Sequence, residues 1–478
     1  MLLGTSFTKL AENNVDYWMK PDATLSAKQV EEQLINLKWN EDSNLQIYIH
    51  VPFCTQKCSF CAFSGGNSLA FEEARDYANL VITQLDDIYE RTGLKSKKID
   101  TIHIGGGSPD LLNDQIGLIL LYLVNLPGFH TETEIAVEFS LYSMRPEFLE
   151  ELGKYPVTKA SFGVQILNPT IRKYIKMPQR LRKFDEVSAQ LRKTIPVVNV
   201  DLMTGFPEQS LDDVMSDLEY FINHPSINCI SSYLFSQGAA PAFIADVLAG
   251  HIPTPPTEEH HANLRLHTFS TLQRHGWRRY GTNTYIDISD VPVQELQKIK
   301  GNECLGAHAY NDFLIAVGAS AVGYFPGLRV ENKTNLDDWI NDVKRGRLPY
   351  DLFKCSLDKQ KDMALWGFPL NYHGLKKSVY DDLVREGIID QTQQDAFRDF
   401  ISQGLIRLGS DGVYNLTITG EVFQGHIVKG LKKQRDQSVI SEYIQEGRKL
   451  AELAASGVIT VENALNNRQQ SILKQTEE

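Results

Sequence analysis

Three of the chain's six cysteines, Cys54, Cys58 and Cys61, fall within the short stretch HVPFCTQKCSFCAFS. This stretch follows LQIYIHV at residues 45–51, an apolar run rich in isoleucine that predicts a strand. A structural zinc site or a ferredoxin-type cluster requires a fourth ligand, and the other three cysteines stand alone in the sequence. Three thiolates on one loop can instead hold three irons of a 4Fe-4S cluster and leave the fourth iron open. The spacing therefore predicts an iron–sulfur centre suited to chemistry on a bound ligand.

A second motif, IGGGSPD at residues 104–110, follows the next predicted strand. Its three consecutive glycines carry no side chains that would block the approach of backbone donors to a ligand. Glu138, Gln165 and Asp201 lie on or at the ends of the three strands predicted after that. Because the carboxyl ends of parallel strands meet at one rim, we expect all these residues to face a common site.

Short β-branched runs alternate with longer amphipathic segments between residues 45 and about 330. This rhythm favours parallel strands joined by right-handed crossovers, and six such units predict an α/β fold, a partial (β/α)6 barrel. The predicted strands are 45–51, 99–105, 134–140, 158–164, 197–203 and 227–235, and the predicted helices are 71–91, 114–124, 146–152 and 211–222.

The rhythm changes beyond the barrel. Helical segments at 357–368, 376–386 and 394–402 precede two short strands, LIRLG and GVYNLT, and a helix is expected to begin near Thr419. Three helices and a hairpin predict a small winged-helix-like domain, a fold often used without nucleic acid. We therefore divide the chain into an N-terminal segment (1–44), the barrel (45–330), a C-terminal winged-helix-like domain (331–432) and a polar helical tail (433–478).

Composition limits the partners and the compartment. A net charge of −12 without a dense basic stripe argues against a nucleic-acid partner. The start MLLGTSFTKL lacks the basic residues and apolar core of a secretion signal, and the apolar run at residues 116–124 is too short to span a bilayer. We therefore expect a cytoplasmic protein.

Seven segments together carry a family resemblance: IYIHVPFCTQKCSFC, HIGGGSP, AVEFS, SFGVQILN, VDLMTGFPEQS, VGASAVG and LTITGE. Between about residues 45 and 431 the chain resembles the radical S-adenosylmethionine (SAM) superfamily, and within it the branch of oxygen-independent coproporphyrinogen III oxidase. The resemblance implies a 4Fe-4S cluster held by Cys54, Cys58 and Cys61, with SAM chelating the fourth iron. An electron from the reduced cluster would then cleave SAM and release a 5′-deoxyadenosyl radical. Members of this branch have room for two SAM molecules.

The same resemblance assigns ligand contacts. The cleaved SAM would contact Tyr48, Gly106, Glu138 and Val322. The second SAM would contact Phe60, Gly107, Ser108, Gln165, Asp201 and Ser236. One position departs from the family pattern, because Met177 stands where an arginine would meet a SAM carboxylate, and a lysine or arginine nearby is not geometrically equivalent.

Two departures separate the relatives. The oxidase carries a further cysteine where this chain has Phe63, and the haem chaperone carries a haem-holding element where this chain has ECLGAH at 303–308. The resemblance therefore favours a class C radical SAM methyltransferase, which would methylate an sp² carbon of an aromatic or conjugated ring. The naphthoquinone ring of menaquinone is our first expectation, with a reduced flavodoxin or ferredoxin as electron donor and peripheral contact with the membrane.

The alternative is a haem- or porphyrin-handling protein: an anaerobilin synthase-like ring-opening methyltransferase, a haem chaperone or an oxygen-independent coproporphyrinogen III oxidase. Either substrate is hydrophobic and conjugated. We expect the substrate cavity to be lined by Tyr233, Phe235 and the segment 310–313.

Overall fold

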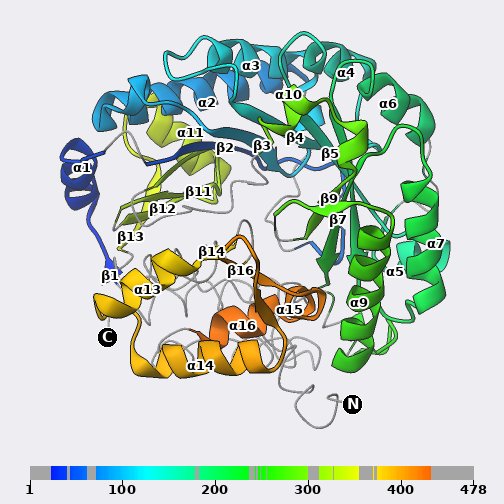
Figure 1. The fold of residues 1–478 in the computed structure, drawn as a ribbon. Helices are drawn as coiled ribbons and strands as arrows, with labels where there is room; N and C mark the ends of the chain where they lie inside the picture. Colours follow the sequence, from blue (N-terminus) through cyan, green and yellow to red (C-terminus); the bar gives the residue numbers. More distant parts are fainter. Residues whose placement is uncertain are drawn as a thin grey trace.

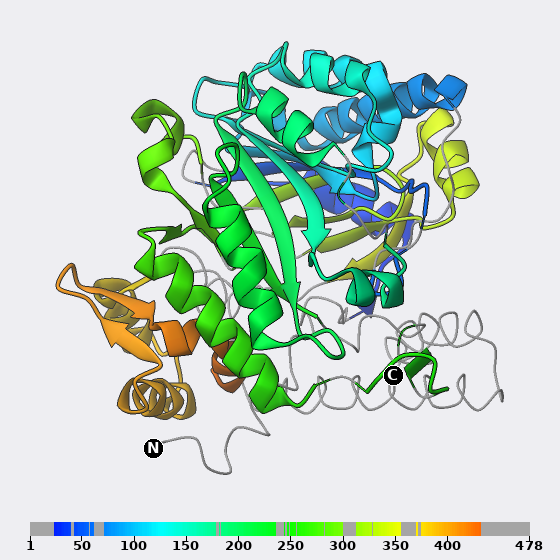
Figure 2. The same ribbon diagram turned by 90° about the vertical axis from the view of Figure 1, so that its right-hand side faces the viewer.

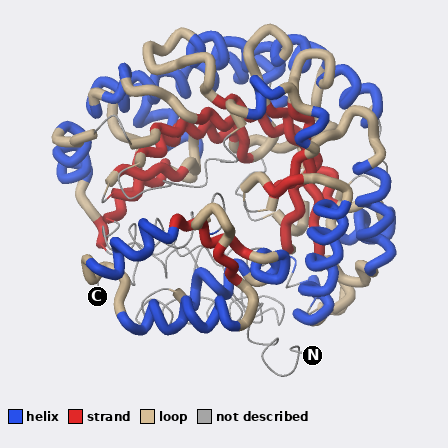
Figure 3. Tube along the Cα trace, in the orientation of Figure 1, coloured by secondary structure: helices blue, strands red, loops and turns tan. Residues whose placement is uncertain are grey.

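The structure is a computed structural model, and it describes residues 23–39, 43–56, 58–61, 71–177, 181, 183–235, 243, 246–247, 249–254, 256–281, 283–299, 312–326, 328–354, 370 and 374–431. A curved sheet forms the inner layer of the larger part, and helices cover its outer face (Figure 1 and Figure 3). A smaller module lies in the opening between the two ends of the curve (Figure 1).

Six consecutive parallel strands form the centre of the sheet, and each pairs with the next along the chain. They are β2 (Leu45–Val51), β3 (Thr101–Gly106), β4 (Glu134–Phe139), β5 (Lys159–Gln165), β6 (Val197–Thr204) and β7 (Cys229–Leu234). All six predicted strands are thereby confirmed, as is the α/β partial barrel. The parallel pairing places the carboxyl ends of these strands at one rim.

Helices connect the strands on the outer face (Figure 3). They are α2 (Phe71–Thr92), α3 (Ile116–Val124), α4 (Pro146–Leu152), α5 (Pro169–Tyr174), α6 (Phe184–Leu191), α7 (Leu211–Ile222) and α9 (Glu258–Arg274), with short 3-10 turns η3 (Leu94–Ser96) and η4 (Pro109–Gln115). Side chains fix where several of them begin. Ser210 and Asp213 form a capping box at the start of α7, and Asn168 accepts two backbone N–H bonds at the start of α5, where Pro169 suits the first turn.

The sheet continues beyond the six central strands at both edges. Among the described residues, thirteen strands share it in the order β1-β13-β12-β11-β10-β2 to β7-β9-β8. The added elements are β1 (Ala23–Thr24), α1 (Ala27–Ile35), β8 (Arg278–Arg279), β9 (Thr284–Ile286), η6 (Ile288–Asp290), α10 (Val293–Leu296), β10 (Phe313–Val317), β11 (Val322–Phe325), β12 (Leu328–Asn332), α11 (Leu336–Lys344) and β13 (Tyr350–Lys354). The sheet therefore passes residue 330, where we expected the barrel to end.

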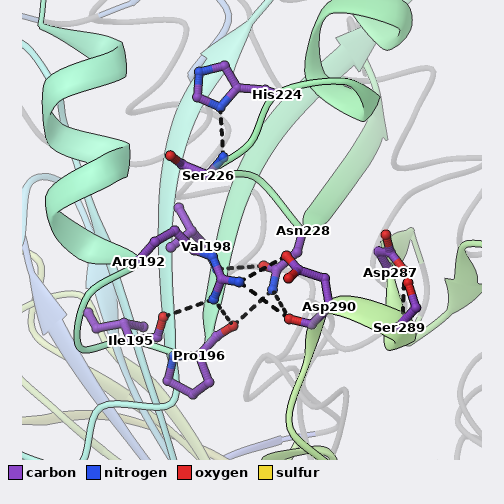
Figure 4. A network of polar contacts seen from close by, with 10 residues as sticks. All are labelled: Arg192, Ile195, Pro196, Val198, His224, Ser226, Asn228, Asp287, Ser289 and Asp290. Carbon is purple, nitrogen blue, oxygen red and sulfur yellow. Dashed lines mark hydrogen bonds and ion pairs between the residues drawn. The ribbon is translucent and has the colours of Figure 1, made fainter.

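A guanidinium network closes the amino-terminal end of β6 (Figure 4). Arg192 donates to the carbonyl oxygen of Pro196 at 2.8 Å and to the Asp290 carboxylate at 2.9 Å. Asn228 accepts from the backbone N–H of Val198 at 2.9 Å, which ties the segment before β7 to β6. These bonds satisfy backbone groups at the end of the barrel opposite the carboxyl rim.

The C-terminal module contains α13 (Lys377–Arg385), α14 (Gln391–Ser402), α15 (Ile418–Val422) and α16 (Gln424–Gly430) and a three-stranded antiparallel sheet of β14 (Leu375–Lys376), β15 (Ile406–Leu408) and β16 (Val413–Leu416). Two of the three predicted helices and the predicted hairpin are present, and Gly412 in the hairpin turn has φ +76°. The predicted helix at 357–368 and the tail at 433–478 lie outside the described residues.

Helix α9 joins the module to the barrel (Figure 2). Arg265 on α9 is 4% exposed, and it donates to the carbonyl oxygen of Val422 at 2.9 Å and to Asn283 at 3.3 Å. The carboxylate of Glu421 lies 3.5 Å from Arg279 and bonds to the Tyr285 hydroxyl. The interface therefore contains buried charges whose partners come from both parts. No helix in the described part of the chain is long and apolar enough to cross a membrane.

Replacing Arg265 by alanine should lower the free energy of unfolding by about 3 kcal/mol, because it leaves the buried carbonyl oxygen of Val422 and the side-chain oxygen of Asn283 without their donor. Urea unfolding followed by circular dichroism measures the loss. Lys28→Ala is the control, since Lys28 is 84% exposed in a surface pair with Glu32 and should cost less than about 0.5 kcal/mol. Equal losses in the two variants would contradict a structural role for the buried network.

Candidate functional site

The cysteine loop leaves β2 at the carboxyl rim and is fastened to the last residues of α5. Cys54, Cys58 and Cys61 are each half-buried, and the backbone N–H of Cys61 donates to the carbonyl oxygen of Cys58 at 3.2 Å. Three bonds tie the loop to the last residue of α5 and the two residues after it: Gln56 Nε2 to Lys176 O at 2.7 Å, Ser59 N to Ile175 O at 3.2 Å and Ser59 Oγ to Tyr174 O at 3.2 Å. The loop therefore holds its three thiols in a fixed position at the rim.

The chemistry of these thiols fits a cluster. Burial, together with the neighbouring thiols of Cys61 and Cys54, raises the pKa of Cys58 to about 12. Iron would stabilise the thiolate that this setting otherwise disfavours. No group of three His, Cys, Asp or Glu side chains within the described ranges could hold a single metal ion. A cubane takes each thiolate on a separate corner, so its ligands stand further apart than those of one ion.

The glycine turn at the end of β3 lies directly against the start of the cysteine loop. Gly107 N donates to Val51 O at 2.8 Å and Ser108 N donates to Phe53 O at 2.6 Å. A Cβ added at Gly107 would meet those same two carbonyl oxygens at 2.7 and 2.4 Å, so only glycine fits. We expected backbone donors here to face a ligand. For Gly107 and Ser108 this was wrong, because both N–H groups extend the pairing of β3 with β2.

A line of polar side chains crosses the inner face of β2, β3 and β4. Tyr48 Oη lies 2.8 Å from His50 Nδ1, the Tyr48 ring lies 5.7 Å from the ring of His103, and His103 Nε2 lies 3.3 Å from Glu138 Oε1. Burial lowers the pKa of His50 to about 4, and the nearby Glu138 opposes the shift. His50 is therefore neutral near pH 7. Glu138 is 36% exposed and can receive a ligand's donors at the rim.

Asp201 on β6 is held by two donors. Ser161 Oγ donates to one of its carboxylate oxygens at 3.0 Å and Asn199 Nδ2 donates to the other at 2.8 Å. Ser231 Oγ donates in turn to Asn199 Oδ1 at 3.1 Å, which fixes the orientation of that amide. The network orients a half-buried carboxylate on the inner face of the sheet.

Gln165 ends β5 in a left-handed backbone conformation, with φ +67°, where the strand pairing shifts by one residue. A Cβ at Gly163 would meet the Gln165 side-chain amide at 2.4 Å, so the side chain folds back over this glycine. Left-handed glutamine is uncommon and requires support from its surroundings. The bulge re-aims the side chain at the rim.

Met177 is 8% exposed and belongs to an apolar cluster, so the position at which the resemblance gives an arginine carries no charge here. The buried members of this cluster are Ile166, Ile171, Ile175, Met177, Phe206, Phe235, Phe243 and Ile252. Cys58 and Phe60 pack against it, with the ring of Phe60 5.8 Å from that of Phe206. Cys58, one of the three expected ligands of the iron–sulfur cluster, therefore lies beside an aromatic surface.

Val322 and Phe313 are among the predicted positions that the structure describes, and several others lie outside the described residues. Val322 is half-buried and begins β11, at the rim reached by β10. Phe313 pairs with Leu45 at the amino-terminal end of its strand, so our expectation that it lines the substrate site was wrong. The following predicted or diagnostic positions lie outside the described residues: Phe63, Ser236 and 303–311.

Four buried residues of the site were missed by the sequence analysis. Nδ1 of His50 would lie 2.5 Å from a Cβ built on Gly106, so this ring packs against the glycine turn. Asp110, which follows the glycines, accepts from the backbone N–H of Ser140 at 2.9 Å and so joins the turns after β3 and β4. The other two are His103 and Arg172. Alternation along β2 and β3 could have found the histidines, because residues two apart share a face.

Comparison with known proteins bears on this site. Residues 48–221 match the family profile described as the Radical SAM superfamily. That stretch contains the three cysteines, the glycine turn, Glu138, Gln165 and Asp201. This segment is a radical SAM domain. The family implies a 4Fe-4S cluster and SAM, and together they supply a carbon-centred radical when bound.

Two heme chaperones and an oxidase are similar to the chain over most of its length. HemW of Bacillus subtilis is 24% identical over 390 residues, covering 80% of this chain and 97% of the relative. HemW of Buchnera aphidicola (subsp. Schizaphis graminum) is 22% identical over 395 residues, with the same coverage. The oxygen-independent coproporphyrinogen III oxidase of Cereibacter sphaeroides is 25% identical, covering 64% of this chain and 68% of the relative.

A solved structure shares the fold of the radical SAM domain and its module. Coproporphyrinogen III oxidase (HemN) from Escherichia coli superimposes with a TM-score of 0.69 at 16% sequence identity, covering 87% of this chain and 96% of that protein. The profile match over residues 48–221 confirms the expected superfamily, and the named relatives support the resemblance to the coproporphyrinogen-oxidase-like branch.

Gly107→Ala should weaken SAM binding by roughly tenfold or more, because the new methyl group must push the turn away from two backbone oxygens. Equilibrium binding of SAM to the anaerobically reconstituted protein measures the effect. Gly153→Ala is the control, since its nearest contact would be an ordinary 3.5 Å. Unchanged affinity in Gly107→Ala would mean that the turn does not contact SAM.

Asp110 predicts a pH dependence of stability. Burial raises the pKa of this carboxyl to about 6, against the hydrogen bonds that lower it. The folded state therefore holds its proton more tightly than the unfolded state, and the free energy of unfolding should fall by roughly 3 kcal/mol as pH rises from about 4 to about 6. In Asp110→Asn the free energy of unfolding, measured by urea titration, should no longer fall between about pH 4 and about pH 6. Glu132→Gln, which changes an exposed surface pair, should keep this fall. Parallel curves for Asp110→Asn and the parent would refute the assignment.

Proposed function

We propose that this chain is a radical SAM protein whose substrate is a tetrapyrrole, either haem or a porphyrin. The observation that carries the proposal is the aromatic surface beside the cluster loop. Phe60 and Phe206 lie edge to face at 5.8 Å, and Phe206 and Phe235 lie 5.1 Å apart. A flat conjugated ring can stack against the half-buried edge of this surface, at Phe60, next to Cys58.

The named relatives support the same choice. The curated relatives that match the chain over most of its length are named for haem and coproporphyrinogen, which are tetrapyrroles. None of the three is named for a quinone. The tetrapyrrole reading is therefore preferred to the naphthoquinone methyltransferase that the sequence first suggested.

The residues of the rim have distinct tasks in this proposal. Tyr48, Gly106, Glu138 and Val322 would bind the SAM that is cleaved, and Glu138 would accept hydrogen bonds from its amine or ribose. The apolar cluster at Phe60 would exclude water from the radical. A reduced flavodoxin or ferredoxin would supply the electron.

Methylation of the tetrapyrrole ring is the second candidate reaction. Gln165 and Asp201 support it, since the resemblance assigns both to a second SAM and both lie half-buried on β5 and β6. Met177 weakens it, because a buried thioether cannot pair with a carboxylate. A methyl transfer would release S-adenosylhomocysteine together with 5′-deoxyadenosine.

The test supplies haem, coproporphyrinogen III or demethylmenaquinone separately to the reduced, cluster-loaded protein with SAM. We expect a tetrapyrrole to raise 5′-deoxyadenosine formation at least roughly tenfold over the substrate-free rate, because binding the correct substrate completes the site. Cys58→Ser should abolish the product, and Cys229→Ser, at a buried position on β7, should retain it.

The products separate the reactions. Equal amounts of S-adenosylhomocysteine and 5′-deoxyadenosine, with a tetrapyrrole heavier by one methyl group, identify ring methylation. Formation of 5′-deoxyadenosine without S-adenosylhomocysteine identifies a non-methylating reaction on the tetrapyrrole. Stimulation by demethylmenaquinone alone would overturn the tetrapyrrole proposal.

A further inference from the structure

Arg172 on α5 lies at the centre of three strand-end loops, although it corresponds to none of the predicted ligand contacts. Its side chain is fully enclosed, with the residue 1% exposed. Nη1 donates to the carbonyl oxygens of Val164 and Ile166, each at 2.6 Å, and Nη2 donates to the hydroxyl of Tyr142. Tyr142 follows β4, and Val164 and Ile166 surround the end of β5.

The two carbonyl groups flank Gln165, whose backbone is left-handed. A guanidinium presents several donors in one rigid plane, so a single side chain can hold both carbonyls in a fixed relation. Asp217 on α7 accepts from the backbone N–H of Leu167 at 3.2 Å and supports the turn from its other side. The bonds from Arg172 are therefore placed where they can sustain an uncommon backbone conformation.

The same short helix also carries the cysteine loop. The carbonyl groups of Tyr174, Ile175 and Lys176, which begin two residues after Arg172, accept the three bonds from Gln56 and Ser59. A displacement of α5 would therefore move the cysteine loop and the Gln165 turn together.

Arg172 also acts on the cluster loop through its charge. Its guanidinium bonds to Tyr142, and Tyr142 and Cys58 pack against the same apolar cluster, so this buried positive charge lies beside the cysteine loop. Reduction adds one negative charge to a cluster, and a nearby buried cation stabilises that added charge. Arg172 should therefore make the bound cluster easier to reduce.

We propose that Arg172 is a positioning residue that couples the cluster loop to the Gln165 turn and raises the reduction potential of the cluster. The proposal rests on the bound cluster and SAM, and it is independent of which substrate the protein uses. Arg172 donates to oxygen atoms of Val164, Ile166 and Tyr142, and so it does not replace the ligand-binding arginine absent at Met177.

The test compares Arg172→Gln and Arg172→Lys, and neither measurement needs a substrate. The first is the reduced fraction of the cluster at a fixed applied potential, read from its paramagnetic resonance signal. The second is the binding curve for SAM. Arg172→Gln should lower the reduced fraction and the SAM affinity, each by roughly tenfold, since it removes both the charge and the paired donors.

Arg172→Lys separates the two effects. Lysine keeps the charge but not the planar pair of donors, so the reduced fraction should stay near that of the parent while SAM affinity falls. Arg192→Gln is the matched control: Arg192 also donates to loop carbonyls, at the opposite end of the barrel, and should change neither measurement (Figure 4).

The outcomes divide clearly. A parent-like reduced fraction and SAM affinity in Arg172→Gln, or changes that match those of Arg192→Gln, would overturn the proposal. If Arg172→Gln does not fold, Arg172→Lys decides alone: lost affinity with a retained reduced fraction supports the proposal, and parent-like affinity or a lost reduced fraction overturns it. A substrate other than a tetrapyrrole would leave both measurements unchanged, so the two proposals fail separately.

Discussion

Parallel pairing of β2 to β7 is the constraint on which the site depends. Each strand runs in the same direction as its neighbours, so the cysteine loop, the glycine turn, Glu138 and the Gln165 turn all occur at one rim. Residues separated by more than a hundred positions in the sequence therefore become neighbours at this rim. The barrel provides the common edge, and the loops provide the chemistry.

Backbone hydrogen bonds make this edge rigid where the cofactors would bind. The pairing of β2 with β3 continues past the strands, through Gly107 and Ser108, into the start of the cysteine loop. The far side of that loop is bonded to the end of α5. The loop is thus held on two sides before any iron binds, and a preorganised set of thiols lowers the cost of assembling the cluster.

Much of this arrangement could be predicted from the sequence. The spacing of Cys54, Cys58 and Cys61 specifies three ligands, and the alternation of β-branched runs with amphipathic segments specifies the parallel strands between them. The strand-end residues Glu138 and Gln165 follow once the strands are placed. These features are local, and local patterns survive in the sequence.

Other features depend on contacts between distant segments. Gly107 N–H donates to Val51 O because of the register between β3 and β2, and a run of glycines in the sequence does not reveal that register. Phe313 was placed at the wrong end because the direction of β10 relative to β2 is a property of the sheet. The role of Arg172 depends on where α5 packs, and an arginine followed by a lysine in a six-residue helix gives no sign of that.

The position of β10 also affects how the protein is made. Strand β2 carries the cysteine loop, and its second neighbour, β10, lies beyond β3 to β9 in the chain. During synthesis one edge of β2 must therefore remain without its final partner until nearly the whole barrel has been translated. The three thiols are therefore translated long before the sheet around them is complete. Iron that is delivered before the chain leaves the ribosome would reach a cysteine loop whose strand, β2, still lacks its β10 neighbour.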